Sequence, residues 1–361
     1  MKHNFRKVIA ASVASLAIIT SFPMQNITKT PIIPVSASAG FTGEYGKQTA
    51  EGFMLYYALD DSNNTCQIVR SDVTTSGATV TLTDTVTFNG KTYTVVSIGP
   101  TAFRNNKNLR HISGTAKHIT RIESGAFMGC ENLWDLELYK ETDPAYLLEG
   151  SVEYIGDSAF KDCTGLKSIF CLENAKDIGA WAFWGANLGH VWLHDVYSIG
   201  EAAFYNSTII SFMTTGSHLE SIPDFAFCNC DYLSIASVDN SVKTIGKQAY
   251  ANCDRLTDVI LPASVKTIDT GAFMNCPKLT GAIAAQVEEV KDHAFFNCPK
   301  MTGFQTNNMD VTFGDYAMGY CYYNKLIKNP KFTIYAPGCG STETYAKANH
   351  FTFYYRYMSN Y

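Results

Sequence analysis

The sequence lacks the short motifs by which many active sites are identified. It contains no H-E-x-x-H, no G-x-S-x-G and no G-x-x-x-x-G-K-[ST] pattern, which would point to a zinc protease, a hydrolase nucleophile or a phosphate-binding loop. We therefore predict no catalytic residue, no cofactor and no metal centre, and expect a protein that is not an enzyme. The enzymatic alternative left open is a secreted hydrolase or peptidase with a site of unfamiliar form.

The sequence also lacks a hydrophobic run long enough to cross a membrane. The apolar segment Val8 to Ile19 has about a dozen residues, whereas a membrane-spanning helix needs about 20. Three basic residues precede it and Ala37-Ser38-Ala39 follows it, the pattern of a secretory signal peptide cleaved before Gly40. We expect residues 1–39 to be removed and the mature protein to be secreted, without membrane insertion. An uncleaved anchor is the alternative, because the stretch between the apolar run and the cleavage site is long.

Basic residues are in the minority. The expected signal peptide holds four of the 28 Lys and Arg residues and none of the 33 Asp and Glu residues, so the mature chain carries a net charge of −9. Because affinity for phosphate backbones depends on Lys and Arg, nucleic acid and anionic membranes are not expected as partners. The chain is 46% hydrophobic, which is enough apolar surface to fold rather than stay disordered.

What the sequence does contain is a repeat. An Ala followed by a large apolar residue recurs ten times, with spacings of 24, 33, 23, 21, 23, 23, 23, 22 and 23 residues. This period lies in the leucine-rich-repeat range. We predict a repeat solenoid of about ten repeats, mainly β with short helical or irregular turns. The pairs are Ala102-Phe103, Ala126-Phe127, Ala159-Phe160, Ala182-Phe183, Ala203-Phe204, Ala226-Phe227, Ala249-Tyr250, Ala272-Phe273, Ala294-Phe295 and Ala317-Met318.

One block shows how each repeat is built. Leu256, Val259 and Leu261 fit the L-x-x-L-x-L pattern of a short strand. Side chains alternate between the two faces of a strand, so Val259 and Leu261 are expected to point inward and Ile260 outward. The Val-x-x-Ile unit and the Ala-Phe pair supply the return segment, in which the small Ala allows close approach and the Phe fills the interior.

The ends of the chain do not follow the period. Residues 40–96 alternate apolar and polar residues and contain Asn89-Gly90, a hairpin signal, so we predict a β-rich N-terminal cap. The solenoid is expected over residues 97–330, with an insertion at about 139–150, and a C-terminal cap over residues 331–361. Insertions in solenoids form loops on one face, often a binding face, although a tolerated surface loop is the simpler interpretation.

The repeat resembles that of the BspA-like leucine-rich repeat family of bacterial surface and secreted proteins. The family pattern, roughly I-G-x-x-A-F-x-x-C-x-x-L-x-x-I-x-L-P, matches the segment that begins at Ile155-Gly156 and ends at Ile169, and the resemblance extends from residue 97 to about 355. It implies a surface or secreted location and a role in adhesion to host matrix proteins or to other cells. The chain departs from the pattern at Pro223 and Asp269, where Gly is usual, and at Ala186, which replaces Cys.

Seven of the eleven cysteines lie three residues after the aromatic position and form what we call the Cys column. Neighbouring rungs about 4.8 Å apart satisfy the distance range for a disulfide. Parallel side chains with two equivalent neighbours do not satisfy its dihedral requirement, so we predict a column of buried free thiols that act as small apolar fillers. Its members are Cys130, Cys163, Cys230, Cys253, Cys276, Cys298 and Cys321. The partners of Cys66, Cys171, Cys228 and Cys339 are left open.

Two histidines give the best candidate for a metal site. His190 and His194 are four residues apart on one expected strand, so both lie on the same face. A zinc site needs further converging ligands, and no third one is evident. We therefore interpret the two histidines, with Trp192 between them, as a polar and aromatic surface patch.

The register of the repeat predicts one outward position per strand. Three successive members of this column are large and apolar, namely Phe170, Trp192 and Met213, and Leu172, His190 and His194 flank them. Contiguous exposed apolar surface often marks an interaction site, so these six residues are our candidate ligand-binding residues. The alternative is that a loop or a second copy of the chain covers these residues. The register is least secure near Ile209 and Ile210, where a slip of one residue would turn Met213 inward.

These observations favour a secreted or cell-surface binding protein that presents a rigid repeat platform to an extracellular protein or glycan, without catalysis. The alternatives are the hydrolase or peptidase with an unfamiliar site and a purely structural envelope protein. The identity of the partner, the host and the oligomeric state are left open.

Overall fold

The computed structural model describes residues 40–138, 152–169 and 172–356. The chain divides into two units, residues 1–40 and residues 41–361, and every strand and helix of the described residues lies in the second. The expected signal peptide, the insertion at 139–150 and Phe170 lie outside the described residues. No helix in the described part of the chain is long and apolar enough to cross a membrane.

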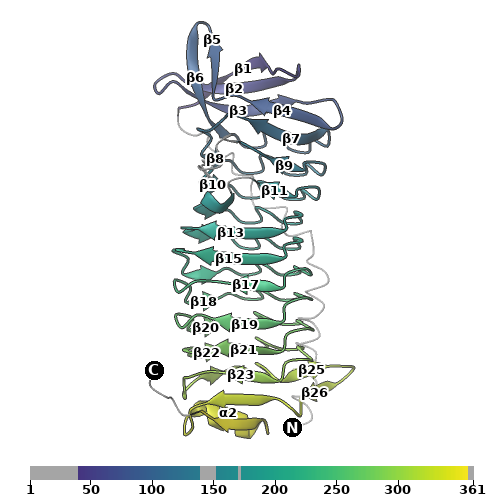
Figure 1. The fold of residues 1–361 in the computed structure, drawn as a ribbon, viewed down its shortest axis with the longest axis vertical. Helices are drawn as coiled ribbons and strands as arrows, with labels where there is room; N and C mark the ends of the chain where they lie inside the picture. The colour runs from purple at the N-terminus through teal and green to yellow at the C-terminus, as the bar shows by residue number, and fades with distance from the viewer. Residues whose placement is uncertain (1–39, 139–151, 170–171, 357–361) are drawn as a thin grey trace, which may run out of the picture. The chain divides into compact units, whose positions relative to one another are not determined.

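The predicted β solenoid is confirmed, with the strands of successive repeats stacked one above another (Figure 1). One side of each repeat is a two-residue strand that ends in a buried apolar residue, and neighbouring copies pair in parallel. We call this stack the Ile ladder. Its first part is β6 (Lys91–Ile98), β8 (Arg121–Ile122), β10 (Tyr154–Ile155), β12 (Asp177–Ile178) and β14 (Ser198–Ile199). Its second part is β16 (Ser221–Ile222), β18 (Thr244–Ile245), β20 (Thr267–Ile268), β22 (Glu289–Val290) and β24 (Thr312–Phe313).

The other side of each repeat is the L-x-x-L-x-L strand, and these strands also pair in parallel. We call this stack the Leu ladder. It forms three sheets, the first made of β4 (Ala78–Leu82), β7 (Leu109–Gly114), β9 (Asp135–Leu136) and β11 (Ser168–Ile169). The second contains β13 (His190–His194), β15 (Ser211–Thr215) and β17 (Ile235–Ser237). The third contains β19 (Asp258–Leu261), β21 (Gly281–Ala284), β23 (Gly303–Gln305), β27 (Thr333–Ala336) and β28 (Thr352–Tyr355).

The interior is filled as the Ala-Phe pair predicts. The rings of successive repeats stack face to face from Phe103 to Phe295, with centroids 5.1 to 5.4 Å apart. The Ala before each ring is buried, which leaves room for the backbones to approach. Each aromatic N–H donates to the Ala carbonyl of the following repeat, as from Phe127 to Ala159 at 2.8 Å. The pair therefore serves both as core and as a third ladder of hydrogen bonds.

Two further side-chain columns join the repeats. All seven members of the Cys column are buried and free, as predicted. Six of the seven thiols donate to the carbonyl of the preceding repeat's aromatic residue, as from Cys163 to Phe127 at 3.1 Å. Beside them the side-chain amides of successive asparagines form a hydrogen-bonded ladder. Asn252 donates to Asn229 at 2.7 Å and accepts a hydrogen bond from Asn275 at 2.8 Å. These asparagines have positive φ, near 60°, a conformation that Asn tolerates better than most residues.

Residues 40–96 form strands that continue the two ladders. Here β1 (Thr42–Gln48), β2 (Met54–Asp60) and β3 (Thr65–Asp72) pair antiparallel, and β3 then pairs in parallel with β6. The predicted hairpin is present, because β5 (Thr85–Phe88) meets β6 across Asn89-Gly90, both of which have positive φ. A type I′ turn requires this at both positions. Strand β6 runs across the expected boundary at residue 96, so the cap and the first repeat share one continuous strand.

The last repeats contain elements that the period did not predict. A two-stranded hairpin, β25 (Tyr320–Tyr322) and β26 (Leu326–Lys328), interrupts the repeat after Met318. The polar run that begins at Ser341 is a helix, α2 (Ser341–Ala348), which packs against β24, β27 and β28. Its Glu343 is buried and accepts bonds from the backbone of Cys339 and the hydroxyl of Tyr355.

The Ile ladder is interrupted at the place where the repeat pattern is broken by Pro223. In other repeats the residue after the Ile donates its N–H to the Ile of the preceding repeat, as from Gly200 to Ile178 at 2.7 Å and from Gly246 to Ile222 at 2.8 Å. Proline has no N–H to donate, and strand pairing stops at β14 and resumes at β16. The other departure, Asp269, keeps its bond to Ile245 because it retains its N–H.

Candidate binding surface

Trp192 and Met213 lie side by side on the Leu ladder. Strands β13 and β15 pair in parallel with Trp192 opposite Met213. Their side chains are 53% and 39% exposed, respectively. Directly opposed positions on neighbouring strands face the same way, so the two side chains form one apolar surface. The predicted juxtaposition of these two residues is confirmed.

The alternation of the two strands explains this orientation. In β13 the side chains of Val191 and Leu193 are buried, which leaves His190, Trp192 and His194 outside. In β15 Phe212 and Thr214 are buried on either side of Met213. A slip of one residue would expose Phe212, which packs between the rings of Phe204 and Phe227. The aromatic core therefore fixes the register that the sequence left uncertain.

Both histidines are exposed, as predicted, and each bonds to a hydroxyl of the next repeat. The Nδ1 of His190 lies 2.7 Å from the Oγ of Ser211, and that of His194 lies 2.7 Å from the Oγ1 of Thr215. The His194 ring also contacts the Trp192 ring, with centroids 4.7 Å apart. These contacts hold the rings in place, and we call His190, Trp192, His194 and Met213 the Trp192 patch. In the described part of the chain no group of three possible ligands could hold a metal ion.

Two predicted members of the site do not join the patch. Phe170 lies outside the described residues. Leu172 was expected to be exposed, and this prediction is wrong, because its side chain is only 7% exposed. It begins a short 3-10 helix, η2 (Leu172–Asn174), so the alternation of β11, which ends at Ile169, does not continue to Leu172. A strand register cannot be extended into a helical turn.

Glu173 beside the patch was missed by sequence reasoning. It follows Leu172 in η2, which packs against β13, and its Oε1 atom is buried without a hydrogen-bond partner among the residues that the structure describes. Burial raises the pKa of this carboxyl, and the nearby His194 opposes the rise. No motif marks such a residue, because its setting depends on the unexpected turn.

The outward column of the Leu ladder continues toward the C-terminus with further apolar residues. Ile260 is 68% exposed and pairs with Ile283 on the next strand. Further along the same column come Gln305, Tyr335 and Tyr354, and the last two are exposed. The exposed side chain of Ser237 separates this stretch from Met213. Within the outward column, Trp192 and Met213 are therefore separate from the later apolar residues. Ile235 of β17, which is 55% exposed, faces the same side one rung from Met213.

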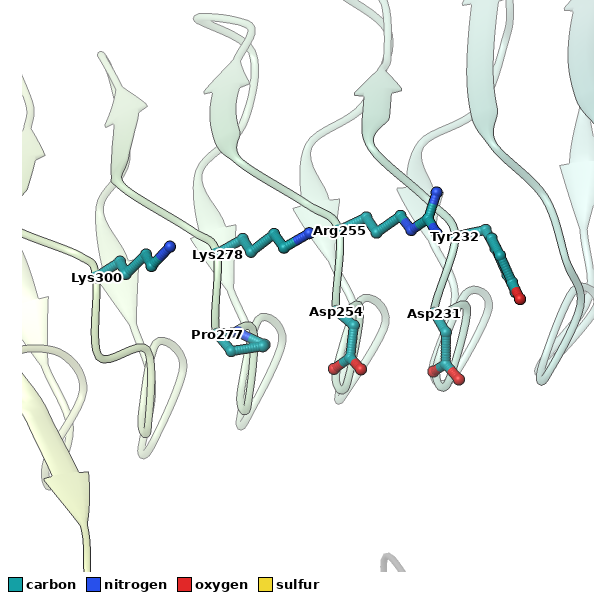
Figure 2. Close-up of a pocket in the computed structure, with 7 residues that line it drawn as sticks. All are labelled: Asp231, Tyr232, Asp254, Arg255, Pro277, Lys278 and Lys300. Carbon is teal, nitrogen blue, oxygen red and sulfur yellow. The ribbon is translucent and has the colours of Figure 1, made fainter.

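A second feature lies in the loops that follow the Cys column, and Figure 2 shows it in close-up. A hollow of about 470 Å³ is lined there by residues of four successive repeats. No sequence motif indicates it, because each repeat contributes only one or two residues between Cys and the next Leu. The lining residues are Asp231, Tyr232, Asp254, Arg255, Pro277, Lys278 and Lys300.

The charges around this hollow are separated by sign. The cationic side chains extend along the stacking direction, whereas the carboxylates of Asp231 and Asp254 point away from them (Figure 2). The Arg255 guanidinium lies 4.7 Å from the centre of the Tyr232 ring, within the range of a cation–π contact. Burial and then the neighbouring Asp254 raise the pKa of Asp231, so its carboxylate is not stabilised by the cations.

Solved structures of other proteins are similar to this chain. A leucine-rich repeat protein from Bacteroides ovatus is 19% identical, with a TM-score of 0.51 over 79% of this chain and 85% of that one. A leucine-rich cell surface protein from Faecalibacterium prausnitzii is 21% identical, with a TM-score of 0.44 over 88% and 96% of the two chains. The pneumococcal vaccine antigen PcpA is 16% identical, with a TM-score of 0.35 over 87% and 99%. No curated protein gives a significant match.

The family comparison covers most of the solenoid. The BspA type leucine-rich repeat region matches in six copies, at residues 82–211, 146–230 and 197–325. These ranges include the Ile ladder, most of the Leu ladder, the aromatic stack, the Trp192 patch and the hollow. The chain therefore belongs to the BspA-type leucine-rich repeat family.

Proposed function

We propose that the protein is an extracellular binding protein that holds a protein or glycan partner on the Trp192 patch. The observation that carries the proposal is the pairing of Trp192 with Met213, both substantially exposed on one rigid sheet. A signal-peptide pattern at residues 1–39 and a family of bacterial surface proteins support an exported or surface location.

The energetics of the patch suit binding. Burial of a large apolar side chain contributes about 1.5 to 3 kcal/mol, and aromatic residues at the centre of an interface often dominate affinity. The Trp192 ring lies against His194, which is itself hydrogen-bonded to Thr215. Less side-chain freedom is therefore lost on binding, which lowers the entropic cost of association.

The hydrolase alternative has one contact to consider. Ser211 and His190 bring a hydroxyl within 2.7 Å of an imidazole nitrogen, the arrangement of a nucleophile and its base. The patch is open and exposed, however, and such a reaction relies on donors that stabilise the oxyanion in a site shielded from water. We therefore assign the contact a positioning role for the His190 ring. Labelling with a fluorophosphonate tests this, because a reactive Ser211 would be modified in the native protein and not in Ser211→Ala.

The proposal is tested by removal of the patch. In the double variant Trp192→Ser/Met213→Ser we expect at least a tenfold loss of affinity, because two anchors of about 1.5 to 3 kcal/mol each are lost. The measurement is surface plasmon resonance of the mature chain against a panel of purified matrix proteins and glycans. The readout is the affinity for each probe that the wild type binds.

A matched control tests whether a loss of binding is specific to the patch or follows from any loss of exposed apolar side chains. Tyr197→Ser/Ile260→Ser removes two other exposed apolar side chains, 53% and 68% exposed, and should bind as the wild type does. Circular dichroism should be the same for all three proteins. Equal binding by the patch variant and the wild type would reject the proposal.

A further inference from the structure

Three successive repeats place a cation at the same position beside the hollow. Arg255, Lys278 and Lys300 each lie two residues after a member of the Cys column, at the start of the turn into the Leu ladder. We call these three residues the basic column. Their backbones are one rung apart, or about 4.8 Å. Each side chain extends along the stacking direction toward the preceding repeat, and the guanidinium of Arg255 ends beside Tyr232 (Figure 2).

The basic column differs from the lysines of the Ile ladder, several of which have an acidic partner. Along the Ile ladder lysines pair with glutamates of adjacent repeats, as Lys176 does with Glu153 at 2.7 Å and Lys243 with Glu220 at 2.9 Å. Among the described residues none forms an ion pair with Arg255, Lys278 or Lys300. Stacked like charges repel each other, and the cation–π contact with Tyr232 offsets this repulsion at Arg255.

The residue type directly after the Cys changes from acidic to proline along the basic column. The residue directly after the Cys is Asp231 and then Asp254 in two repeats, but Pro277 and Pro299 in the next two. Acidic side chains are therefore absent from these loop positions beside Lys278 and Lys300. At the other end of the hollow the Tyr232 ring is 45% exposed. The surface thus combines a row of cations with an aromatic face.

The spacing of the cations distinguishes among linear anions. An extended acidic peptide advances about 3.3 Å per residue and presents alternate side chains to one face, so its charges recur about every 6.6 Å. A stacked nucleic acid strand places one phosphate about every 3.4 Å. Neither matches a rung of about 4.8 Å. A pyranose ring is comparable in length to a rung, so a polysaccharide with one anionic group per ring, all turned to the same side, can place successive charges one rung apart.

We propose that the basic column and Tyr232 form a binding site for a linear polysaccharide that carries one sulfate or carboxylate per sugar. The chain runs along the stacking direction, its anionic groups meet Arg255, Lys278 and Lys300 in turn, and one sugar face stacks on Tyr232. Aromatic rings supply the apolar contact that sugar faces require, and cations in register with the charges supply the specificity. The site is separate from the Trp192 patch and does not depend on it.

The test compares two variants of equal charge. Arg255→Gln/Lys278→Gln/Lys300→Gln removes the basic column, and Lys176→Gln/Lys243→Gln/Lys266→Gln removes three lysines of the Ile ladder that are ion-paired. The probes are dextran sulfate and polygalacturonate, which distinguish sulfate from carboxylate, with uncharged dextran and poly-glutamate as references. Binding is measured by isothermal titration calorimetry at low and at physiological salt, with the mature full-length chain.

We expect the wild type and the control variant to bind at least one anionic polysaccharide with affinities within threefold of each other. The basic-column variant should bind at least tenfold more weakly, and the wild-type affinity should fall as salt rises. Dextran should not bind. Equal loss in both variants would show general charge attraction and overturn the proposal, as would no binding of either anionic polysaccharide at low salt.

A second variant tests the assignment to a sugar. Tyr232→Ser should weaken the binding of the polysaccharide at least threefold, and Tyr232→Phe should retain it, because the ring and not the hydroxyl makes the contact. Poly-glutamate that binds as tightly as the polysaccharide would overturn the assignment in favour of an acidic peptide. Circular dichroism confirms that each variant keeps the fold.

Discussion

The thiols of the Cys column illustrate what a single residue does in this repeat. Each is small enough to fit beside the aromatic stack, and six of the seven donate to a carbonyl of the preceding repeat, as Cys253 does to Phe227. In two of the three repeats without Cys a small buried residue takes its place, namely Ala186 and Ser207. In the first repeat the position holds the half-buried Asn106, whose side chain accepts bonds from the backbone of Asn108 and Leu109. Within the stack the position therefore requires small size first and a donor second.

These thiols should be unreactive in the folded protein. Burial raises the pKa of Cys130 and Cys230 to about 12, and the thiolate is the reactive form. We expect the nine buried free cysteines of the described chain to resist a thiol reagent such as DTNB at pH 8, whereas Cys339, which is exposed, reacts. After denaturation all eleven cysteines should react. Regular disulfides between neighbouring repeats, found by mass spectrometry, would contradict this.

Single residues also show where sequence reasoning succeeded. The Ala-Phe pair fixed the register, so it correctly placed Val259 and Leu261 inside and Trp192 outside. It failed at Leu172, because a 3-10 turn there ends the alternation on which the prediction depended. It could not find the basic column, because no property of Arg255, Lys278 or Lys300 taken singly differs from an ordinary surface cation. Only stacking brings the three side chains together.

At the scale of elements, the helix α2 is tied to the last strand by one carboxylate. Glu343 in its first turn pairs with Lys347 one turn later and accepts a bond from Tyr355 of β28. This strand is the last of the Leu ladder, and an edge strand needs such protection from pairing with other chains. The sequence predicted a cap here but not a helix, since an eight-residue helix has too few apolar positions to show a period.

This carboxylate should make the C-terminal region sensitive to acid. The bond from Lys347, and then those from Tyr355 and the Cys339 backbone, lower the pKa of Glu343 from its ordinary value of 4.5 to about 2. A depressed pKa stabilises the fold above pH 4.5, and this contribution is lost as pH falls toward 2. The protection factors of the β28 amides, which correct hydrogen exchange for the intrinsic rate at each pH, should therefore fall over this range in the wild type. In Glu343→Gln the fall should be much smaller, and an equal fall in both would contradict the assignment.

At the scale of the whole molecule, the repeats interact mainly with their neighbours, because every ladder joins one repeat to the next. Stability in such proteins is approximately a sum over repeats and their interfaces. The period could be read from the sequence because each repeat must present the same surface to the repeats on both sides. The hairpin β25–β26 could not be read in this way, since a projecting element is free of that constraint.

Removal of one complete period should therefore preserve the fold. Ile245 and Ile268 occupy equivalent positions in successive repeats. Deletion of residues 246–268 joins Ile245 to Asp269, so it removes one complete repeat and keeps every ladder in register. We expect an unchanged circular dichroism spectrum per residue and a single cooperative unfolding transition. Deletion of residues 246–257 removes only about half a period. Strands of the Ile ladder would then stack on segments of the Leu ladder, so this deletion should abolish folding. A cooperative fold in the second deletion would contradict the register described here.

Pro223 has a consequence for how the protein responds to force. The hydrogen bonds of all the ladders run from repeat to repeat, so a pull on the two ends of the solenoid loads the interfaces between repeats in series. Between β14 and β16 the Ile ladder is open, and the bond from Phe204 to Ala226 is among those that remain. Tension should therefore part the stack at an interface where one ladder is open, and the one between β14 and β16 lies only one rung beyond the strand that carries Trp192.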